Sequence, residues 1–215
     1  MLPQSRYLMG FLCVAIGCSV ALLPVSAETA KTRANGTPEW ASAAWPEHRS
    51  NISNWPAQVS QVNDLISAAE PDARADLPTI SELLTEPFGV IAPAALLGNW
   101  RCRSLQAGSL GVFVYPYFKC AIRVDGKHLE FAKLSGSQRS SGRLYADSEK
   151  RWIYLGGASV NEDPSVAYSQ LKRPGPSSEP LESDVYGVLQ QRAPNHLVLL
   201  INPDGESYEV YELRR

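Results

Sequence analysis

From Gly98 onward the apolar residues recur at every second position, in short runs separated by turn residues. This period predicts half-buried β-strands. The connections are short: Asp125-Gly126 is a two-residue hairpin signal, and residues 203–205 (Pro-Asp-Gly) form another tight turn. Short hairpins make neighbours in sequence antiparallel neighbours in space. The predicted strands are residues 99–106, 117–124, 128–135, 138–146, 151–157, 185–192, 196–202 and 207–214.

The segment before these strands has helical spacing instead. Val59, Val62 and Ile66 form one apolar stripe of a helix that opens at Pro56, and shorter helices are expected over 78–85 and 93–97. Eight strands in a meander predict a barrel, because closure removes the exposed edges of a sheet. We therefore expect an α+β fold, mainly β, with N-terminal helices packed on a closed or nearly closed eight-stranded antiparallel barrel over 98–215.

Two segments lack a regular period. Residues 28–52 are rich in Ala, Thr, Ser and Pro, and we interpret them as an extended or disordered lead, with Trp40, Trp45 and Trp55 attaching it to the domain. The connection over 158–184 is long and Pro/Ser-rich in part. Connections of this length are either functional lids or disordered, and we favour disorder of the Pro/Ser-rich part.

The first 27 residues have the features of a secretory signal peptide. Arg6 is followed by an uncharged apolar run and by small residues before Ala27, where we place the cleavage site. The alternatives are a membrane anchor, since the run almost spans a bilayer, and a lipoprotein attached through Cys18. We expect a periplasmic or secreted protein with no membrane span after cleavage.

Cleavage would leave Cys102 and Cys120 as the cysteines of the mature chain. A pair in an exported protein predicts a disulfide, which would contribute about 3 kcal/mol to stability by constraining the unfolded state. Metal binding is not expected, because His128 and His196 have no Cys or His at ligand spacing.

The two cysteines also assign the faces of the first two strands. A cross-strand disulfide requires both cysteines to project from one face of the sheet. Because side chains alternate between the two faces of a strand, the apolar residues at even spacing from each cysteine lie on that same face. The predicted buried set is Trp100, Cys102, Phe118, Cys120, Ile122 and Val124. The predicted solvent-facing set is Arg101, Arg103, Lys119 and Arg123. Replacing Arg103 by Ala is accordingly expected to have little effect on stability.

The mature chain has 19 basic and 22 acidic residues, a net charge of −3, which gives no reason to expect nucleic acid as a partner. Phosphate loops, dinucleotide fingerprints, HExxH and calcium-loop motifs are absent, so no cofactor is predicted. Residues 136–142 (GSQRSSG) lack the spacing of a nucleophile elbow. An enzyme would therefore need a site that is assembled only in three dimensions.

The strand over 138–146 supplies most of the candidate site residues. One of its faces carries two guanidinium groups, which suit carboxylate or phosphate if that face lines the barrel lumen. If the face points outward, they are solvated surface charges, the usual state of arginine. Tyr115, just before the second predicted strand, and Tyr117, its first residue, complete the set. The ligand-binding candidates are Arg139, Ser141, Arg143, Tyr145, Tyr115 and Tyr117.

Two resemblances follow from these motifs. Gly98-x-Trp100 at the start of the first strand is similar to the lipocalin-type (calycin) barrels, which implies a Trp that plugs the closed end, with Arg214 or Arg215 packed over it. Three sequence motifs together closely resemble an exported bacterial family classed as a domain of unknown function, DUF4893. They are WRCR (100–103), YPYFKC (115–120) and SGSQRSSGRLY (135–145). The latter resemblance implies no activity, ligand or catalytic residue.

These observations favour a non-enzymatic binding module for a small ligand or an envelope protein, inhibitor-like by analogy with barrel-shaped protease inhibitors and on the basis of fold alone. The alternatives are a hydrolytic enzyme and a structural envelope component.

Overall fold

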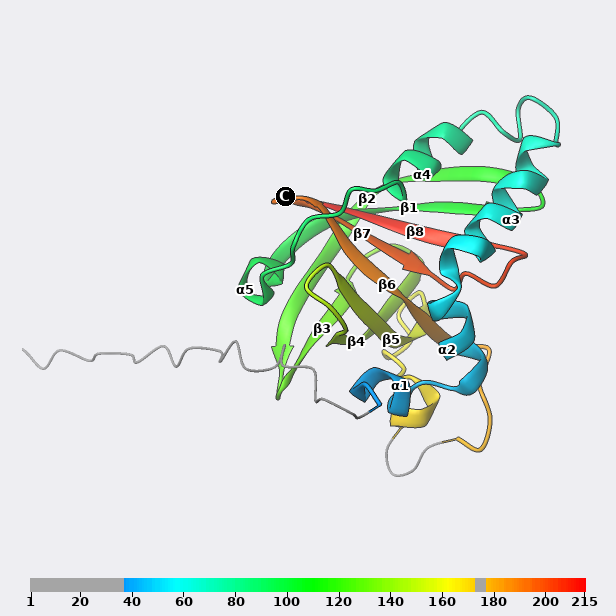
Figure 1. Ribbon diagram of the computed structural model, residues 1–215. Helices are drawn as coiled ribbons and strands as arrows, with labels where there is room; N and C mark the ends of the chain where they lie inside the picture. The colour runs from blue at the N-terminus through cyan, green and yellow to red at the C-terminus, as the bar shows by residue number, and fades with distance from the viewer. Residues whose placement is uncertain (1–36, 173–176) are drawn as a thin grey trace, which may run out of the picture.

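The computed structural model describes residues 37–172 and 177–215, and its centre is a closed barrel of eight antiparallel strands in sequence order (Figure 1). Strand β1 pairs with β2 on one side and with β8 on the other, which closes the barrel. The strands are β1 (Gly98–Gly108), β2 (Gly111–Asp125), β3 (His128–Lys133), β4 (Gln138–Ala146), β5 (Arg151–Val160), β6 (Asp184–Ala193), β7 (His196–Ile201) and β8 (Tyr208–Arg214).

The predicted fold class is confirmed. The main difference in the strands is β2, which begins at Gly111 and continues through Pro116, whereas the sequence predicted a start at residue 117. Proline cannot donate to a ladder, but Pro116 lies where β2 has only β1 as a strand partner, so its missing N–H costs no pairing there.

Period two separates the two faces of the barrel wall. The inward residues pack to a continuous core in which Phe131 and Tyr154 are fully buried. Trp100, Cys102 and Ile122 are buried as predicted. The prediction for Val124 is wrong: it is 55% exposed, because it lies next to the β2–β3 turn, at the end of the wall.

Between residue 37 and the barrel the structure has five helices: α1 (Glu39–Ala43), α2 (Pro46–Ser53), α3 (Trp55–Ser67), α4 (Leu77–Leu83) and α5 (Pro93–Leu96). Helices α3 and α4 lie beside β1 and β2 on the outside of the barrel (Figure 1). Their apolar stripes cover outward-facing strand residues, including Leu105 and Val210. A second apolar layer thus lies outside the wall, where period-two alternation alone predicts polar residues.

Helices α1 and α2 correct the prediction of an extended or disordered lead, which is wrong over 39–52. Both helices are short, and the tryptophans attach the segment to the domain as expected. Trp40 Nε1 donates to Asp147 Oδ1 and Trp45 Nε1 to Ser169 Oγ, each at 2.6 Å. Tertiary contacts rather than helix propensity therefore hold this segment. The rest of the predicted lead and the signal peptide lie outside the described residues.

One end of the barrel is closed by Trp100, as the lipocalin-type resemblance implies. Its Nε1 donates to Leu96 O of α5 at 2.8 Å, and the guanidinium of Arg215 lies 3.8 Å from the ring centroid. Beside it, Cys102 and Cys120 form the predicted disulfide, with their Cα atoms 5.9 Å apart.

The long connection between β5 and β6 is mostly packed against the domain. It contains the short helix η2 (Ser169–Leu171), and Tyr168 and Ser169 are buried. Residues 173–176, in the Pro/Ser-rich part, lie outside the described residues. Among the helices that the structure describes, none has both the length and the apolar character needed to cross a bilayer.

Candidate binding site at the open end of the barrel

The two ends of the lumen differ in chemistry. The indole of Trp100 closes one end, whereas the other end collects the inward-facing polar side chains. We call this set the mouth cluster. Its members are Ser104, Gln106, Lys133, Gln138, Ser140 and Glu209.

Lys133 is the last residue of β3 and shares its inward face with Leu129 and Phe131. Its side chain is among the buried polar groups, with the residue 6% exposed, and Nζ donates to Gln138 O at 2.6 Å. Nζ also lies 4.7 Å from the ring centroid of Phe118. Burial lowers the pKa of Lys133, while the nearby Glu209 opposes that shift. Among the described residues, no carboxylate oxygen lies within 4.0 Å of Nζ.

Glu209 of β8 is the acidic member of the mouth cluster. Its carboxylate accepts hydrogen bonds from the hydroxyl of Ser104 and, at 3.4 Å, from Nε2 of Gln106. Burial raises the pKa of Glu209, and these two hydrogen bonds only partly offset the shift. The mouth therefore holds an ammonium and a carboxylate that are both desolvated and not in direct contact. Desolvated titratable groups cluster at functional sites, so the mouth is a candidate site.

Gln106 spans the mouth through weak contacts. Its Nε2 lies 3.3 Å from Gln138 Oε1, and its Oε1 accepts from the hydroxyl of Tyr115 at 3.4 Å. These distances lie beyond the usual range for N–H···O and O–H···O bonds. A ligand that offered better partners would replace them at little cost.

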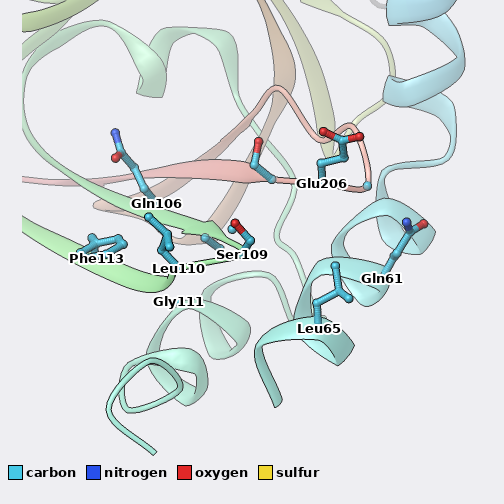
Figure 2. A pocket seen from close by; sticks show the side chains of 12 residues that line it. Gln61, Leu65, Gln106, Ser109, Leu110, Gly111, Phe113 and Glu206 are labelled. Atoms are coloured by element: carbon cyan, nitrogen blue, oxygen red, sulfur yellow. The ribbon is translucent and has the colours of Figure 1, made fainter. Parts of the chain in front are cut away.

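A groove of about 580 Å³ adjoins Gln106 on the outside (Figure 2). It lies between α3, the β1–β2 hairpin and the β7–β8 turn, and is open to solvent. Leu65, Leu110 and Phe113 give it apolar walls, and all three are at least half exposed. The groove is thus an apolar surface that leads to a charged mouth.

A second carboxylate of β8 lies on the outer face of the wall. Glu212 is 1% exposed and accepts from Arg103 Nε at 2.5 Å, Arg214 Nε at 2.8 Å and Tyr117 OH at 3.0 Å. His196 Nε2 lies 3.1 Å from Glu212, but burial lowers the pKa of His196 and favours its neutral form. The bonds therefore tie β1, β2 and β8 together across the seam that closes the barrel.

This arrangement changes the prediction for Arg103. It points outward as expected, but it is not a free surface charge, since it neutralises the buried Glu212. Arg101, Lys119 and Arg123 are exposed, as predicted.

The candidates on β4 all lie on the outer face. Arg139 donates to Asp163 O at 2.7 Å, and Arg143 Nε lies 3.3 Å from Asp125 Oδ2. Tyr145 is buried under α1, and Ser141 shares its outward side. The lumenal alternative for this face is therefore wrong: the residues that line the lumen from β4 are the alternate ones, including Ser140 and Leu144.

The two remaining candidates lie on opposite faces of β2. Tyr115 reaches the mouth cluster through Gln106. Tyr117 lies on the outer face, with Arg101 and Arg103 at 5.2 and 5.4 Å from its ring centroid and its hydroxyl on Glu212. Of the six candidates, the structure thus brings Tyr115 to the mouth.

One group of side chains combines a serine, an aspartate and a histidine. Ser169 Oγ donates to Asp184 Oδ2 at 2.5 Å, while His48 Nδ1 lies 2.7 Å from Tyr168 OH. The serine bonds the carboxylate rather than the imidazole, and Ser169 is fully buried. This arrangement attaches α2 and η2 to the barrel and does not provide an activated nucleophile.

Lys133 and Glu209 were not among the sequence candidates. The alternation along the strands does predict their inward position. Lys133 lies an even number of positions from the apolar Leu129 and Phe131, and Glu209 likewise from Tyr211 and Leu213, so each lies on the same face as its apolar neighbours. A charged residue that ends an otherwise apolar inward series marks the rim of a lumen.

These features define the class of protein: a small closed β-barrel, plugged at one end and polar at the other, with helices on its outer face. The chain belongs to the family described as Domain of unknown function (DUF4893), whose profile matches residues 40–213. Among curated proteins, none matches the chain. Among solved structures, a redesigned beta barrel is similar, with a TM-score of 0.38 and 10% identity, over 60% of this chain and 98% of that one.

Proposed function

We propose that the chain is an exported, non-enzymatic binding module that holds a small carboxylic acid with an apolar body at the open end of the barrel. The observation that carries the proposal is Lys133, an ammonium in a desolvated position that no carboxylate of residues 37–172 and 177–215 contacts. Burying such a charge lowers the stability of the fold, and a ligand or partner of opposite charge would offset that cost by pairing with it. The disulfide between Cys102 and Cys120 supports export, because disulfides persist in oxidising compartments.

The groove indicates what accompanies the acid group. Leu65, Leu110 and Phe113 offer apolar contacts, and Gln106 lines both the groove and the mouth. A ligand with its apolar body in the groove would displace the weak contacts of Gln106 and bring its anionic end toward Lys133. A carboxylate fits a single ammonium better than a phosphate does, since phosphate sites usually gather several donors.

The raised pKa of Glu209 is compatible with an anion in the mouth. Burial raises the pKa of Glu209, which reduces the cost of protonating it beside a bound anion, and a protonated carboxyl group can donate a hydrogen bond to a carboxylate.

Binding of octanoate, octanol and octylamine, measured by calorimetry, tests the proposal. We expect octanoate to bind most tightly and Lys133→Met to weaken it at least tenfold, because the substitution keeps the apolar stem and removes the charge. Lys119→Met is the matched control: it removes an exposed lysine from the outer face of β2 and should leave binding unchanged. Equal affinity for octanol, tighter binding of octylamine, or no binding of any probe would each overturn the proposal.

A further inference from the structure

Strand β2 is much longer than its neighbour β3. It pairs with β1 from Gly111 to Ile122 but with β3 only from Cys120 to Asp125. The first half of β2 therefore has one backbone edge without a strand partner, although the barrel as a whole is closed. Unpaired edges of this kind are the usual sites at which an extended peptide joins a sheet.

The chain itself caps both ends of this edge. Val112 N donates to Ala73 O at 3.1 Å, and Lys119 N donates to Ser135 Oγ at 2.9 Å. Backbone groups alternate along a strand, and the register shifts once opposite Ser104, so Val114 and Tyr117 turn their N–H and C=O groups to the same open side. Within residues 37–172 and 177–215, neither of these N–H groups has an acceptor on that side.

The side chains next to the edge differ between its two faces. On the outer face, Arg101 and Lys119 are exposed, and the carboxylate that accepts from Tyr117, Glu212, is already neutralised by two arginines. On the face toward the mouth, Phe113 and Tyr115 present apolar surface and are 50% and 42% exposed. The edge thus combines open backbone groups with a basic side and an apolar side.

We propose that this edge of β2 binds an extended segment of a partner protein, which adds a strand and bears acidic side chains on its outer face and apolar side chains on the other. Main-chain hydrogen bonds to Val114 and Tyr117 give affinity, and the charge on Arg101 and Lys119 selects the acidic segment. The site uses backbone groups of β2 rather than Lys133, so it is tested at Val114 and Tyr117 even though Phe113 also lines the groove of the proposed ligand.

A second copy of the chain is a poorer occupant of the same edge. Symmetric pairing of two β2 strands would place the two basic faces side by side, and like charges across a strand pair are destabilising. Pro116, which lacks an N–H, also shortens the ladder that two such edges can form.

A seven-residue peptide of alternating valine and glutamate is the probe, with amide hydrogen exchange of the folded protein as the measurement. We expect exchange at Val114 and Tyr117 to slow at least tenfold with the peptide, and the lysine analogue of the peptide to have no effect. In the double variant Arg101→Glu/Lys119→Glu the preference should reverse toward the lysine peptide.

Arg123→Glu/Lys150→Glu is the matched control, since it changes the net charge equally at exposed positions away from the open edge, and it should keep the original preference. Unchanged exchange at both amides with saturating peptide would overturn the proposal, as would protection confined to the mouth cluster. Protection of Val114 and Tyr117 that rises with protein concentration alone would assign the edge to a second copy and would equally overturn it.

Discussion

Strand β8 carries two glutamates, Glu209 and Glu212, on opposite faces of the barrel wall. Glu212 lies outside, is almost fully buried, and is bonded by two guanidinium groups and a tyrosine hydroxyl. Glu209 lies inside, where a serine hydroxyl and a glutamine amide are its hydrogen-bond partners. The first carboxylate has been neutralised by the fold, whereas the second has not. Burial of an acid is thus ambiguous by itself, and its partners decide whether it serves structure or binding.

The pKa values shift in opposite directions for this reason. Burial would raise the pKa of Glu212, but the bonds from Arg103 and Arg214 outweigh it and lower the pKa below the ordinary value. Burial raises the pKa of Glu209, and its neutral partners do not compensate. Three substitutions sharpen or break this comparison.

Glu212→Gln should have the largest effect. It leaves Arg103 and Arg214 without their buried counter-ion, and we expect the free energy of unfolding to fall by about 2–4 kcal/mol at pH 7. Because the folded-state pKa is lowered, the stabilisation by Glu212 is present above the unfolded pKa and is lost as the pH falls through the folded one. Urea unfolding should therefore show that the difference in unfolding free energy between variant and wild type decreases as the pH is lowered. Glu206→Gln, at an exposed turn, is the control, and an equal loss there would refute the assignment.

Arg103→Ala should come second, with a loss of about 1–2 kcal/mol, because Glu212 keeps Arg214 as a cation partner. Arg101→Ala is the matched variant on the same strand and face, and its arginine has no carboxylate in contact among the described residues. It should change stability by less than about 0.5 kcal/mol. Equal unfolding free energies for the two variants would mean that Arg103 contributes no more to stability than a solvated surface arginine.

Glu209→Gln should have the smallest effect, of opposite sign. The folded-state pKa of Glu209 is raised, so the stability it contributes is present below the unfolded pKa and declines as the pH rises through the folded one. At pH 8 the neutral amide removes the burial cost of the charge, and we expect a gain of about 0.5–1 kcal/mol that disappears near pH 4. A loss of stability at pH 8 would show that Glu209 is paired as effectively as Glu212.

The sequence predicted the barrel well because alternation and turn residues are local signals. The β4 strand has the predicted bounds, Gln138–Ala146, since both its ends lie beside hairpin turns. The first half of β2 was missed because Pro116 ends a strand in the interior of a sheet but not at an unpaired edge. Helices α1 and α2 were missed because their stability comes from distant contacts of Trp40 and Trp45.

The site was harder to predict, for a different reason. Which face of β4 is inward depends on closure of the whole barrel, so the arginines of that strand were left with two alternatives. Glu212 and Arg103 come from opposite ends of the β domain and meet only through the pairing of β1 with β8. No local pattern reports such a contact, whereas the parity of Lys133 with Phe131 does report its inward position.

The closing seam also has a kinetic consequence. Seven of the eight ladders join strands that follow one another in the chain, and each of these can form as soon as its second strand is available. The eighth requires β8, so the first strand keeps an open edge until the last one has been synthesised. Glu212, whose hydrogen bonds connect β8 to β1 and β2, belongs to that final strand. The nascent barrel therefore keeps an edge of β1 open to mispairing until β8 is available.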